Sequence, residues 1–444
     1  MPDLSVPKAN SGRTLVQKII ARACGLERVI PGQIVTARVD LAFAHDSSGP
    51  RRWRPLLEAL GVGLWDPSKV AIISDHYVPA VDAESAAILK DVRAFVADYA
   101  VPMFFDMQGI CHLVLPEHGL IRPGEFIAGG DSHTPMAGAF GAYAAGYGAT
   151  DMAAIAATGE TWLTVPETIR IEWSGTFSSG VTAKDLMLYL CRVLGLDNAF
   201  KAIEYAGPTV GAMSMAERMV LCNMAAELGA ETAVIAPDST TLAYLEACGK
   251  PVADPDTVLA LRSDPDAEFE VIHRFDASAL EPQIAGPHSP QNVRPVADFC
   301  GVPIDQAYIG ACVGAKIDDL RMAASVLIGR KVANGTRLLV APASSRVTEL
   351  AASDGTLAIL MAAGATLLPS GCGACAGMGA GLLAAGETCI STTNRNFRGR
   401  MGHADASVYL ASPYAVAAAA VAGKIVDPRP LLMPRPKDSI GSLV

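Results

Sequence analysis

The chain has 444 residues, of which 51% are hydrophobic, so it is long enough to form two or three domains with cores of their own. Its formal net charge of −10 argues against nucleic acid or an anionic membrane surface as the main partner. Ten cysteines are scattered along a chain whose first residues include no apolar signal segment, which favours reduced thiols or a metal site. The charge-free runs are too weakly apolar to span a bilayer, so we expect a cytoplasmic protein.

Short apolar runs typical of strands alternate along the chain with segments of helical periodicity. The predicted strands are residues 70–74, 168–173, 232–237, 337–342 and 365–369. Helical periodicity is clear in ERMVLCNMAAEL and in LRMAASVLIGR. This alternation predicts an α/β fold with mainly parallel sheets. The Pro-rich stretch 281–295 is typical of a connection between domains, and it separates a His/Asp-rich portion from a Cys/Arg-rich portion.

Histidines and aspartates lie close together in the N-terminal portion, beside predicted strand ends and turns. They are His45 with Asp46, Asp75 with His76, His112, and Asp131 with His133 around Ser132. A lone buried histidine is more often structural than catalytic. A carboxylate beside an imidazole, however, sets its tautomer and prepares it for proton transfer near neutral pH. Because the pattern recurs, we expect these side chains to converge on one cleft.

Three cysteines in the C-terminal portion suggest a metal site with one open position. Cys312 follows a predicted strand, and Cys372 and Cys375 form a C-x-x-C pair in a Gly-rich turn after another strand. Open α/β sheets place their sites at the carboxyl ends of strands. Three thiolates on a four-iron cluster would leave one iron free to bind a substrate oxygen. A thiol redox pair, or zinc with Cys389 as fourth ligand, is the alternative for this motif.

A group of arginines follows in the segment TTNRNFRGRMGH. Guanidinium groups recognise carboxylates through two parallel hydrogen bonds and stay charged. An isolated arginine here would be expected in a solvated loop. Because the cysteines lie close by in the sequence, we expect Arg395 and Arg400 to hold a di- or tricarboxylate.

Together the motifs VDLAFAHDSSGP, SDHYVP, GGDSHTPMAGAFGA, YIGACVGAKIDDLR, SGCGACAG and NRNFRGRMGH resemble the aconitase superfamily. The resemblance is closest to the separate large subunits of 3-isopropylmalate dehydratase and related hydro-lyases, and it covers nearly the whole chain. It implies an aconitase-like iron–sulfur fold, with three α/β/α subdomains and mainly parallel sheets around a central cleft. We predict these subdomains at 14–165, 166–285 and 286–430, with a flexible N-terminus at 1–13 and a C-terminal tail at 431–444.

The resemblance also implies a [4Fe-4S] cluster held by Cys312, Cys372 and Cys375, whose open iron binds a 2-hydroxy diacid. It further implies a set of residues that protonate the departing hydroxyl or lie near the iron-bound water. These predicted catalytic residues are Asp75, His76, His112, Asp131, His133 and Glu204. The predicted substrate-binding residues are His45, Ser132, Asn394, Arg395 and Arg400.

Two departures from the family pattern stand out. The chain has Ala311-Cys312-Val313-Gly314 where the family usually has S-C-T-N, so hydroxyl and amide groups that tune a cluster and its ligand are missing. The family's swivelling domain, which supplies a serine base and a further substrate arginine, has no counterpart here. We therefore expect a heterodimer in which a small α/β subunit supplies the base.

The expected reaction is a reversible dehydration or isomerisation of a malate-type 2-hydroxy diacid. The leading substrate is 3-isopropylmalate, of leucine biosynthesis, and the alternatives are 2-methylmalate, 2,3-dimethylmalate and homocitrate-type acids. A different catalytic metal such as zinc in the same thiolate site is another alternative. A cluster-dependent iron sensor that binds RNA is a more remote one, which the charge of −10 disfavours.

Overall fold

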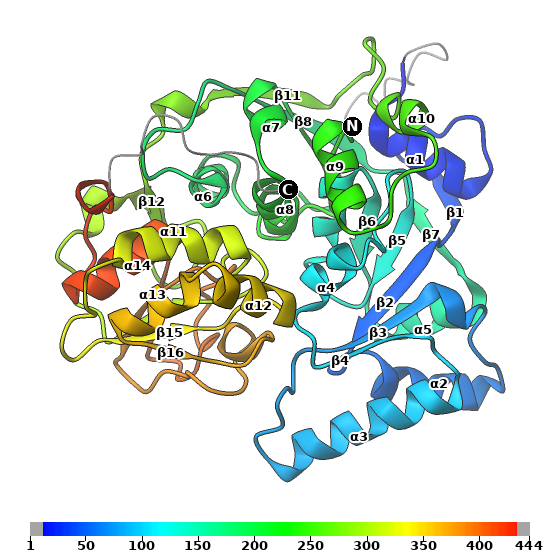
Figure 1. Cartoon of the computed structure of the whole chain (residues 1–444). Helices are drawn as coiled ribbons and strands as arrows, with labels where there is room; N and C mark the ends of the chain where they lie inside the picture. Colours follow the sequence, from blue (N-terminus) through cyan, green and yellow to red (C-terminus); the bar gives the residue numbers. More distant parts are fainter. Residues whose placement is uncertain (1–11, 433–444) are drawn as a thin grey trace.

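Residues 12–432 are described by the computed structural model, and most of their strands fall into three sheets flanked by helices (Figure 1). The predicted N-terminal segment 1–13 and tail 431–444 lie outside the described residues, apart from two residues each. The arrangement confirms the predicted α/β class with mainly parallel sheets. The boundaries that we assigned to the three subdomains stay a prediction.

The first sheet is wholly parallel, with the strand order β4-β3-β2-β5-β6. Its strands are β2 (Leu41–His45), β3 (Val70–Ser74), β4 (Met103–Asp106), β5 (Phe126–Gly129) and β6 (Tyr143–Gly146). The nearby helices are α1 (Leu15–Cys24), α2 (Pro50–Leu60), α3 (Ala83–Asp98), α4 (Cys111–Glu117) and α5 (Ala149–Thr158). β3 coincides with the predicted strand 70–74 and is buried throughout, as expected for a parallel strand covered on both faces.

The second sheet is also parallel, with the order β10-β9-β8-β11. Its strands are β8 (Glu167–Ser174), β9 (Lys201–Ala206), β10 (Thr232–Ile235) and β11 (Val271–Asp276). The helices here are α6 (Ala183–Leu194), α7 (Pro208–Ala212), α8 (Met215–Asn223), α9 (Ser239–Ala247) and α10 (Pro255–Leu259). β8 contains the predicted strand 168–173, and α8 overlaps the first seven residues of the predicted helical segment ERMVLCNMAAEL. A separate antiparallel ribbon joins β1 (Ile34–Arg38) to β7 (Glu160–Thr164).

The third sheet has seven strands in the order β13-β12-β18-β17-β14-β15-β16. Its parallel strands are β14 (Gln306–Ile309), β15 (Arg337–Val340), β16 (Ala365–Leu367), β17 (Thr388–Ser391) and β18 (Ser407–Leu410). Its helices are α11 (Ile317–Leu327), α12 (Ser345–Ser353), α13 (Thr356–Ala363) and α14 (Pro413–Ala422). The predicted strands 337–342 and 365–369 begin where β15 and β16 begin and run two residues past them.

The Pro-rich stretch 281–295 is more than a connection between domains. It contains the strands β12 (Gln283–Ala285) and β13 (Val293–Pro295), which pair antiparallel with each other at one edge of the third sheet. Proline is tolerated at a sheet edge because no neighbour there needs its missing N–H, and this explains why the stretch resembled a linker. β12 joins the third sheet through its pairing with β18.

The three sheets share one core. A single cluster of buried hydrophobic side chains includes Phe43 on β2, Trp173 on β8 and Tyr308 on β14. Burial of this apolar surface fixes the sheets against one another, so their strand ends keep a defined spacing. Among the described helices, none combines the length and the apolar character that crossing a membrane would require.

Candidate active site

The cysteines and the histidine motifs meet in one cavity. The residues that line it are His76, Cys111, His112, Asp131, His133, Ala311, Cys312, Cys372, Cys375, Ala376, Asn394 and Arg400. Most of them lie in turns that follow the carboxyl ends of β3, β5, β14, β16 and β17, strands of the first and third sheets. The structure thus brings together two sets of motifs that are more than 150 residues apart in the sequence.

Backbone geometry holds the three cysteines in place. Cys312 follows Ala311, which adopts a left-handed conformation with φ of 70°, in a tight turn after β14. Gly314 is required in this turn, because a Cβ there would lie 2.2 Å from the Cβ of Thr392. Cys375 lies within a short 3-10 helix, Gly373–Ala376, and Cys372 directly precedes it.

His76 is held by two buried carboxylates. Its Nδ1 is 2.6 Å from Asp75 Oδ1, and its backbone N–H donates to Asp46 Oδ1 at 3.0 Å. The ring of His45 stacks on that of His76, with 3.9 Å between the centroids. Burial lowers the pKa of His76, but the contact with Asp75 and the charges of Asp46 and Asp131 outweigh it and raise the pKa to about 9. His76 is therefore protonated at neutral pH.

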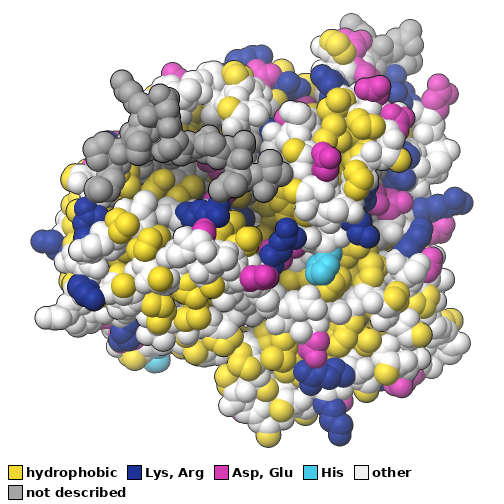
Figure 2. Space-filling view, in the orientation of Figure 1, with side chains coloured by type: hydrophobic (Ala, Val, Ile, Leu, Met, Phe, Trp, Pro, Cys, Tyr) yellow, Lys and Arg dark blue, Asp and Glu magenta, His cyan; other side chains and the backbone are white. Residues whose placement is uncertain are grey.

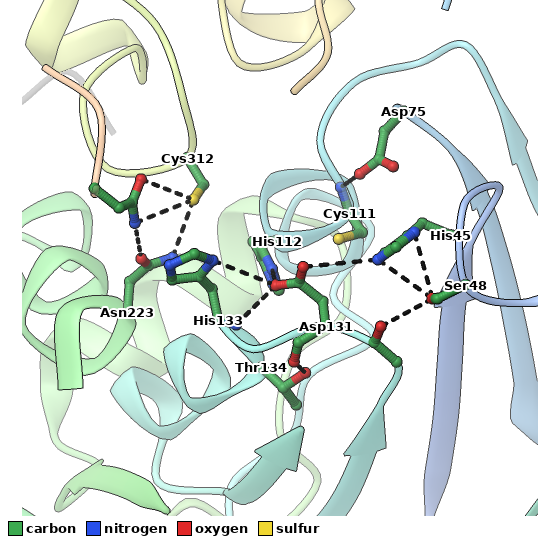
Figure 3. A network of polar contacts seen from close by, with 12 residues as sticks. His45, Ser48, Asp75, Cys111, His112, Asp131, His133, Thr134, Asn223 and Cys312 are labelled. Carbon is green, nitrogen blue, oxygen red and sulfur yellow. Dashed lines mark hydrogen bonds and ion pairs between the residues drawn. The ribbon is translucent and has the colours of Figure 1, made fainter. Parts of the chain in front are cut away.

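Asp131 is the centre of a second network, drawn in Figure 3. Its Oδ1 is 2.6 Å from His112 Nε2 and accepts the backbone N–H of His133 at 2.7 Å, while its Oδ2 is 3.6 Å from His45 Nε2. Burial raises the pKa of Asp131, but the three histidines hold it well below its usual range, so the carboxyl stays ionised. The exposed Ser132 lies between Asp131 and His133 and is not among the residues that line the cavity.

Two residues that we did not predict complete the site. Glu227 Oε1 is 2.9 Å from His133 Nε2 and accepts the N–H of Arg395 Nε at 2.7 Å. Asn223, at the end of α8, donates from Nδ2 to the Sγ of Cys312 at 3.1 Å, and Asn394 lies 3.8 Å from the same sulfur (Figure 3). The four-residue spacing of Asn223 and Glu227 in CNMAAEL, one helical turn, was the available signal.

Glu204 does not belong to the site, so our prediction for it is corrected. It is buried in β9, where its Oε1 accepts from Arg170 on the neighbouring strand at 2.8 Å and its Oε2 accepts from Ser263 at 2.5 Å. Arg170 and Glu204 are direct cross-strand partners in the β8–β9 ladder. Both carboxylate oxygens are therefore used in the second sheet, and the buried glutamate that faces the histidines is Glu227.

The arginines differ in their surroundings. Arg400 lines the cavity, and its Nε is buried with no hydrogen-bond partner among the described residues. Arg395 uses its Nε to hold Glu227, which leaves its terminal nitrogens for another anion. Arg398, the third arginine of the segment, is exposed and lies 3.7 Å from Asp405. The geometry thus favours Arg395 and Arg400 over Arg398 as carboxylate-binding residues.

The donor set of the cavity fits an iron–sulfur cluster. Four cysteines line it, the three predicted ligands and Cys111, and Asn223 donates a hydrogen bond to Cys312, as is common for cluster thiolates. Burial raises the pKa of all three predicted ligand thiols, that of Cys312 to about 12, so a bound metal would be needed to displace their protons. The Oε2 of Glu227 is also buried without a partner among the described residues, which suits a site completed by a ligand.

Comparison with known proteins decides the family. Residues 33–303 and 297–423 match the family model described as Aconitase family (aconitate hydratase). This chain belongs to the aconitase family. Membership implies a [4Fe-4S] cluster, in agreement with the sulfur donors in the cavity.

Relatives match along nearly their whole length. A 3-isopropylmalate dehydratase large subunit 1 of Methanopyrus kandleri is 47% identical over 95% of this chain and 100% of that protein. The 3-isopropylmalate dehydratase large subunit of Aquifex aeolicus is 43% identical, with 94% and 97% covered. A probable methanogen homoaconitase large subunit of Methanothermobacter thermautotrophicus is 42% identical, with the same coverage.

Among solved structures, holo aconitase X of Thermococcus kodakaraensis aligns over 86% of this chain and 89% of its own, with 15% identity and a TM-score of 0.47. The family assignment does not depend on this last comparison.

Proposed function

We propose that this chain is the cluster-bearing large subunit of a hydro-lyase that reversibly dehydrates or isomerises a malate-type 2-hydroxy diacid. The observation that carries the proposal is the shared cavity, in which the three predicted ligand cysteines, together with Cys111, face the buried His/Asp network and Arg400. The names of the relatives make 3-isopropylmalate the first substrate to test. A homocitrate-type acid is the second, because one relative carries a homoaconitase name.

Cys312, Cys372 and Cys375 are the proposed ligands of the cluster. When bound, the cluster would supply a Lewis acid that draws charge from the departing hydroxyl. The oxygen-sensitive cluster and the reduced thiols suit the cytoplasm, the compartment that we propose.

His76 is the proposed proton donor to the departing hydroxyl. Its Nδ1 is held by Asp75, so the proton available to a ligand is the one on Nε2. Because the pKa of His76 is raised to about 9, the ring carries that proton at neutral pH. The ionised Asp131 holds the ring of His112 and the backbone of His133, and Glu227 holds the ring of His133, around the same cavity.

Arg395 and Arg400 are the proposed partners of the two substrate carboxylates. Guanidinium groups recognise carboxylates in a defined plane, which would fix the diacid against the cysteine side of the cavity. Asn394 lines the cavity, His45 stacks on His76, and Ser132 separates Asp131 from His133, so we propose them as further contacts.

Removal of the carbon-bound proton is the step that we assign to a partner. The relatives are named as large subunits, which implies a small subunit for them. We propose that a small swivel-domain subunit brings the base to this cavity and completes the substrate pocket. Binding of nucleic acid is not part of the proposal. On the face shown in Figure 2, the described Lys and Arg side chains are interspersed with Asp and Glu and do not form a basic stripe.

The test is anaerobic co-expression with a candidate small subunit, followed by an assay of alkylmalates. The complex should contain a cluster with a visible absorption band and should dehydrate at least one of these diacids. Cys375→Ser should remove both signals, whereas Cys389→Ser, at a buried cysteine on β17, should keep both. Full turnover by the isolated large chain, or activity of a colourless complex, would contradict the proposal.

A further inference from the structure

A lysine is buried between the second and third sheets, close to the cysteine cavity. Lys184, at the start of α6, is 2% exposed. Its Nζ donates to the carbonyl oxygen of Thr393 at 2.6 Å and lies 3.4 Å from that of Thr392. Burying an ammonium group costs several kcal/mol unless hydrogen bonds and opposite charge compensate. The contacts of Lys184 must therefore compensate for the cost of burying its charge.

The two carbonyls that Lys184 contacts belong to the turn that enters the active site. Thr392 and Thr393 directly precede Asn394 and Arg395. Thr392 Oγ1 accepts from the backbone N–H of Gly310 and donates to its carbonyl, both at 2.9 Å, two residues before Cys312. The turn is thus held on one side by the cysteine loop of the third sheet and on the other by a helix beside the second sheet.

Lys184 and the buried carboxylate of Glu227 favour each other's charged forms. Burial lowers the pKa of Lys184 to about 8, while Glu227, Cys191, Cys375 and Cys312 act in the opposite direction. In return, the lysine lowers the pKa of Glu227 and of Cys375. Lys184 therefore supplies a positive charge to the buried carboxylate and to the sulfur side of the cavity.

We infer that Lys184 is a positioning residue, whose ammonium group fixes the turn of residues 392–395 and so holds Asn394 beside Cys312 and Arg395 beside Glu227. The inference rests on the proposed function, since the cluster and the diacid are what this turn would contact. Methionine at residue 184 leaves two buried carbonyls without their donor, so the turn is less firmly held in the conformation that the site needs. It also removes one of the cations that act on Cys375, alongside Arg400 and Arg395.

The experiment compares K184M, K184Q and K184R in the complex with the small subunit. K184M should raise the KM for the diacid tenfold or more with a smaller fall in kcat, because Arg395 loses its fixed orientation. The midpoint potential of the cluster should become more negative, because a nearby cation is lost. K184R keeps the charge and two donors, so it should recover most of both changes.

R218M is the matched control, because Arg218 is another fully buried cation, on α8, and its partner is Asp238. It should lower stability without changing the KM or the potential. If K184M does not fold, K184Q is compared with K184R instead. Equal KM values and potentials in these two variants would mean that residue 184 acts through packing alone and would overturn the inference. Folded K184M with the wild-type KM and potential would overturn the inference.

A second measurement separates this inference from the proposed function. Before the cluster is loaded, hydrogen exchange in residues 388–401 of the complex should be faster in K184M than in the wild type and unchanged in R218M. Equal exchange in K184M and the wild type overturns the role of Lys184, whatever the enzyme does. A wild-type complex that binds no cluster and dehydrates no diacid contradicts the proposed function. In that case the exchange measurement still tests whether Lys184 holds the turn.

Discussion

The backbone N–H of Cys372 donates to the carbonyl oxygen of Asp75 at 2.8 Å. One partner belongs to the C-x-x-C turn of the third sheet, and the other belongs to the Asp–His pair at the end of β3 in the first sheet. A proposed cluster ligand and the carboxylate that orients the proposed proton donor are therefore joined through one backbone hydrogen bond. This bond runs between backbone atoms, so it does not depend on the chemistry of either side chain.

Glu227 and Glu204 form a matched pair for testing the corrected site. Glu227→Gln removes the negative charge shared by His133 and Arg395, so we expect kcat to fall by about two orders of magnitude or more. Glu204→Gln weakens the cross-strand pair with Arg170 and should cost about 1–3 kcal/mol of stability. Its kcat should stay near that of the wild type. Steady-state kinetics and thermal unfolding of both variants check this, and the reverse pattern would restore Glu204 to the site.

His76 is expected to be essential for the proton transfer. His76→Asn removes the proton donor but keeps a polar side chain, and we expect kcat to fall by about 10²- to 10⁴-fold. His118→Asn is the control, because His118 is exposed at the end of α4 and does not line the cavity. Single-turnover rates with the cluster loaded make the comparison. A His76→Asn enzyme within tenfold of the wild-type rate would show that another group protonates the hydroxyl.

The arginine segment offers an internal control for substrate binding. Arg400→Met should raise the KM for the diacid tenfold or more, because one carboxylate loses a charged partner worth about 1.5–3 kcal/mol. Arg398→Met should leave the KM within about twofold, since Arg398 points to Asp405 at the surface. Initial rates over a range of diacid concentrations measure both. Equal increases in KM for Arg400→Met and Arg398→Met would mean that the segment attracts the diacid through its overall positive charge, without a specific contact from Arg400.

Glu125 should make stability depend on pH. Burial, together with the nearby charge of Asp40, raises the pKa of Glu125 to about 7, from an ordinary value of 4.5. The folded protein thus binds this proton more tightly than the unfolded chain, so the residue lowers stability above pH 7, and the penalty disappears below pH 4.5. Glu125→Gln should therefore stabilise by about 1–2 kcal/mol at pH 8 and by little at pH 4.5, with the half-buried position of the side chain limiting the gain. Thermal unfolding at the two pH values checks the sign, and an equal gain at both would exclude this cause.

The ends of several strands could be predicted from the sequence, because they are marked by the pattern of neighbouring residues. β3 and β15 are short apolar runs bounded by turn residues, and parallel strands covered on both faces have this pattern. Polar motifs that directly follow such strands lie at the carboxyl edge of a sheet. For this reason the positions of Asp75, His76 and Cys312 at strand ends were predicted without any knowledge of the packing.

The Pro-rich stretch and the glutamates show where local patterns stop being informative. β12 and β13 are three-residue strands whose pairing depends on β18, which lies more than 100 residues later in the chain. Glu204 and Glu227 are both buried glutamates in apolar segments. The register of β8 and β9 pairs Glu204 with Arg170. The packing of α8 places Glu227 beside His133 and Arg395.

By itself, the sequence determined the fold class, the family resemblance and the residue types of the site, because apolar periodicity, turn residues and motifs are properties of short segments. The tertiary structure decided which carboxylate faces the histidines, that Asn223 donates to Cys312, and that Lys184 holds the turn before Arg395. These contacts join residues 89 to 209 positions apart. Only the shared core brings such distant residues within hydrogen-bonding distance, and no short-range pattern records that packing.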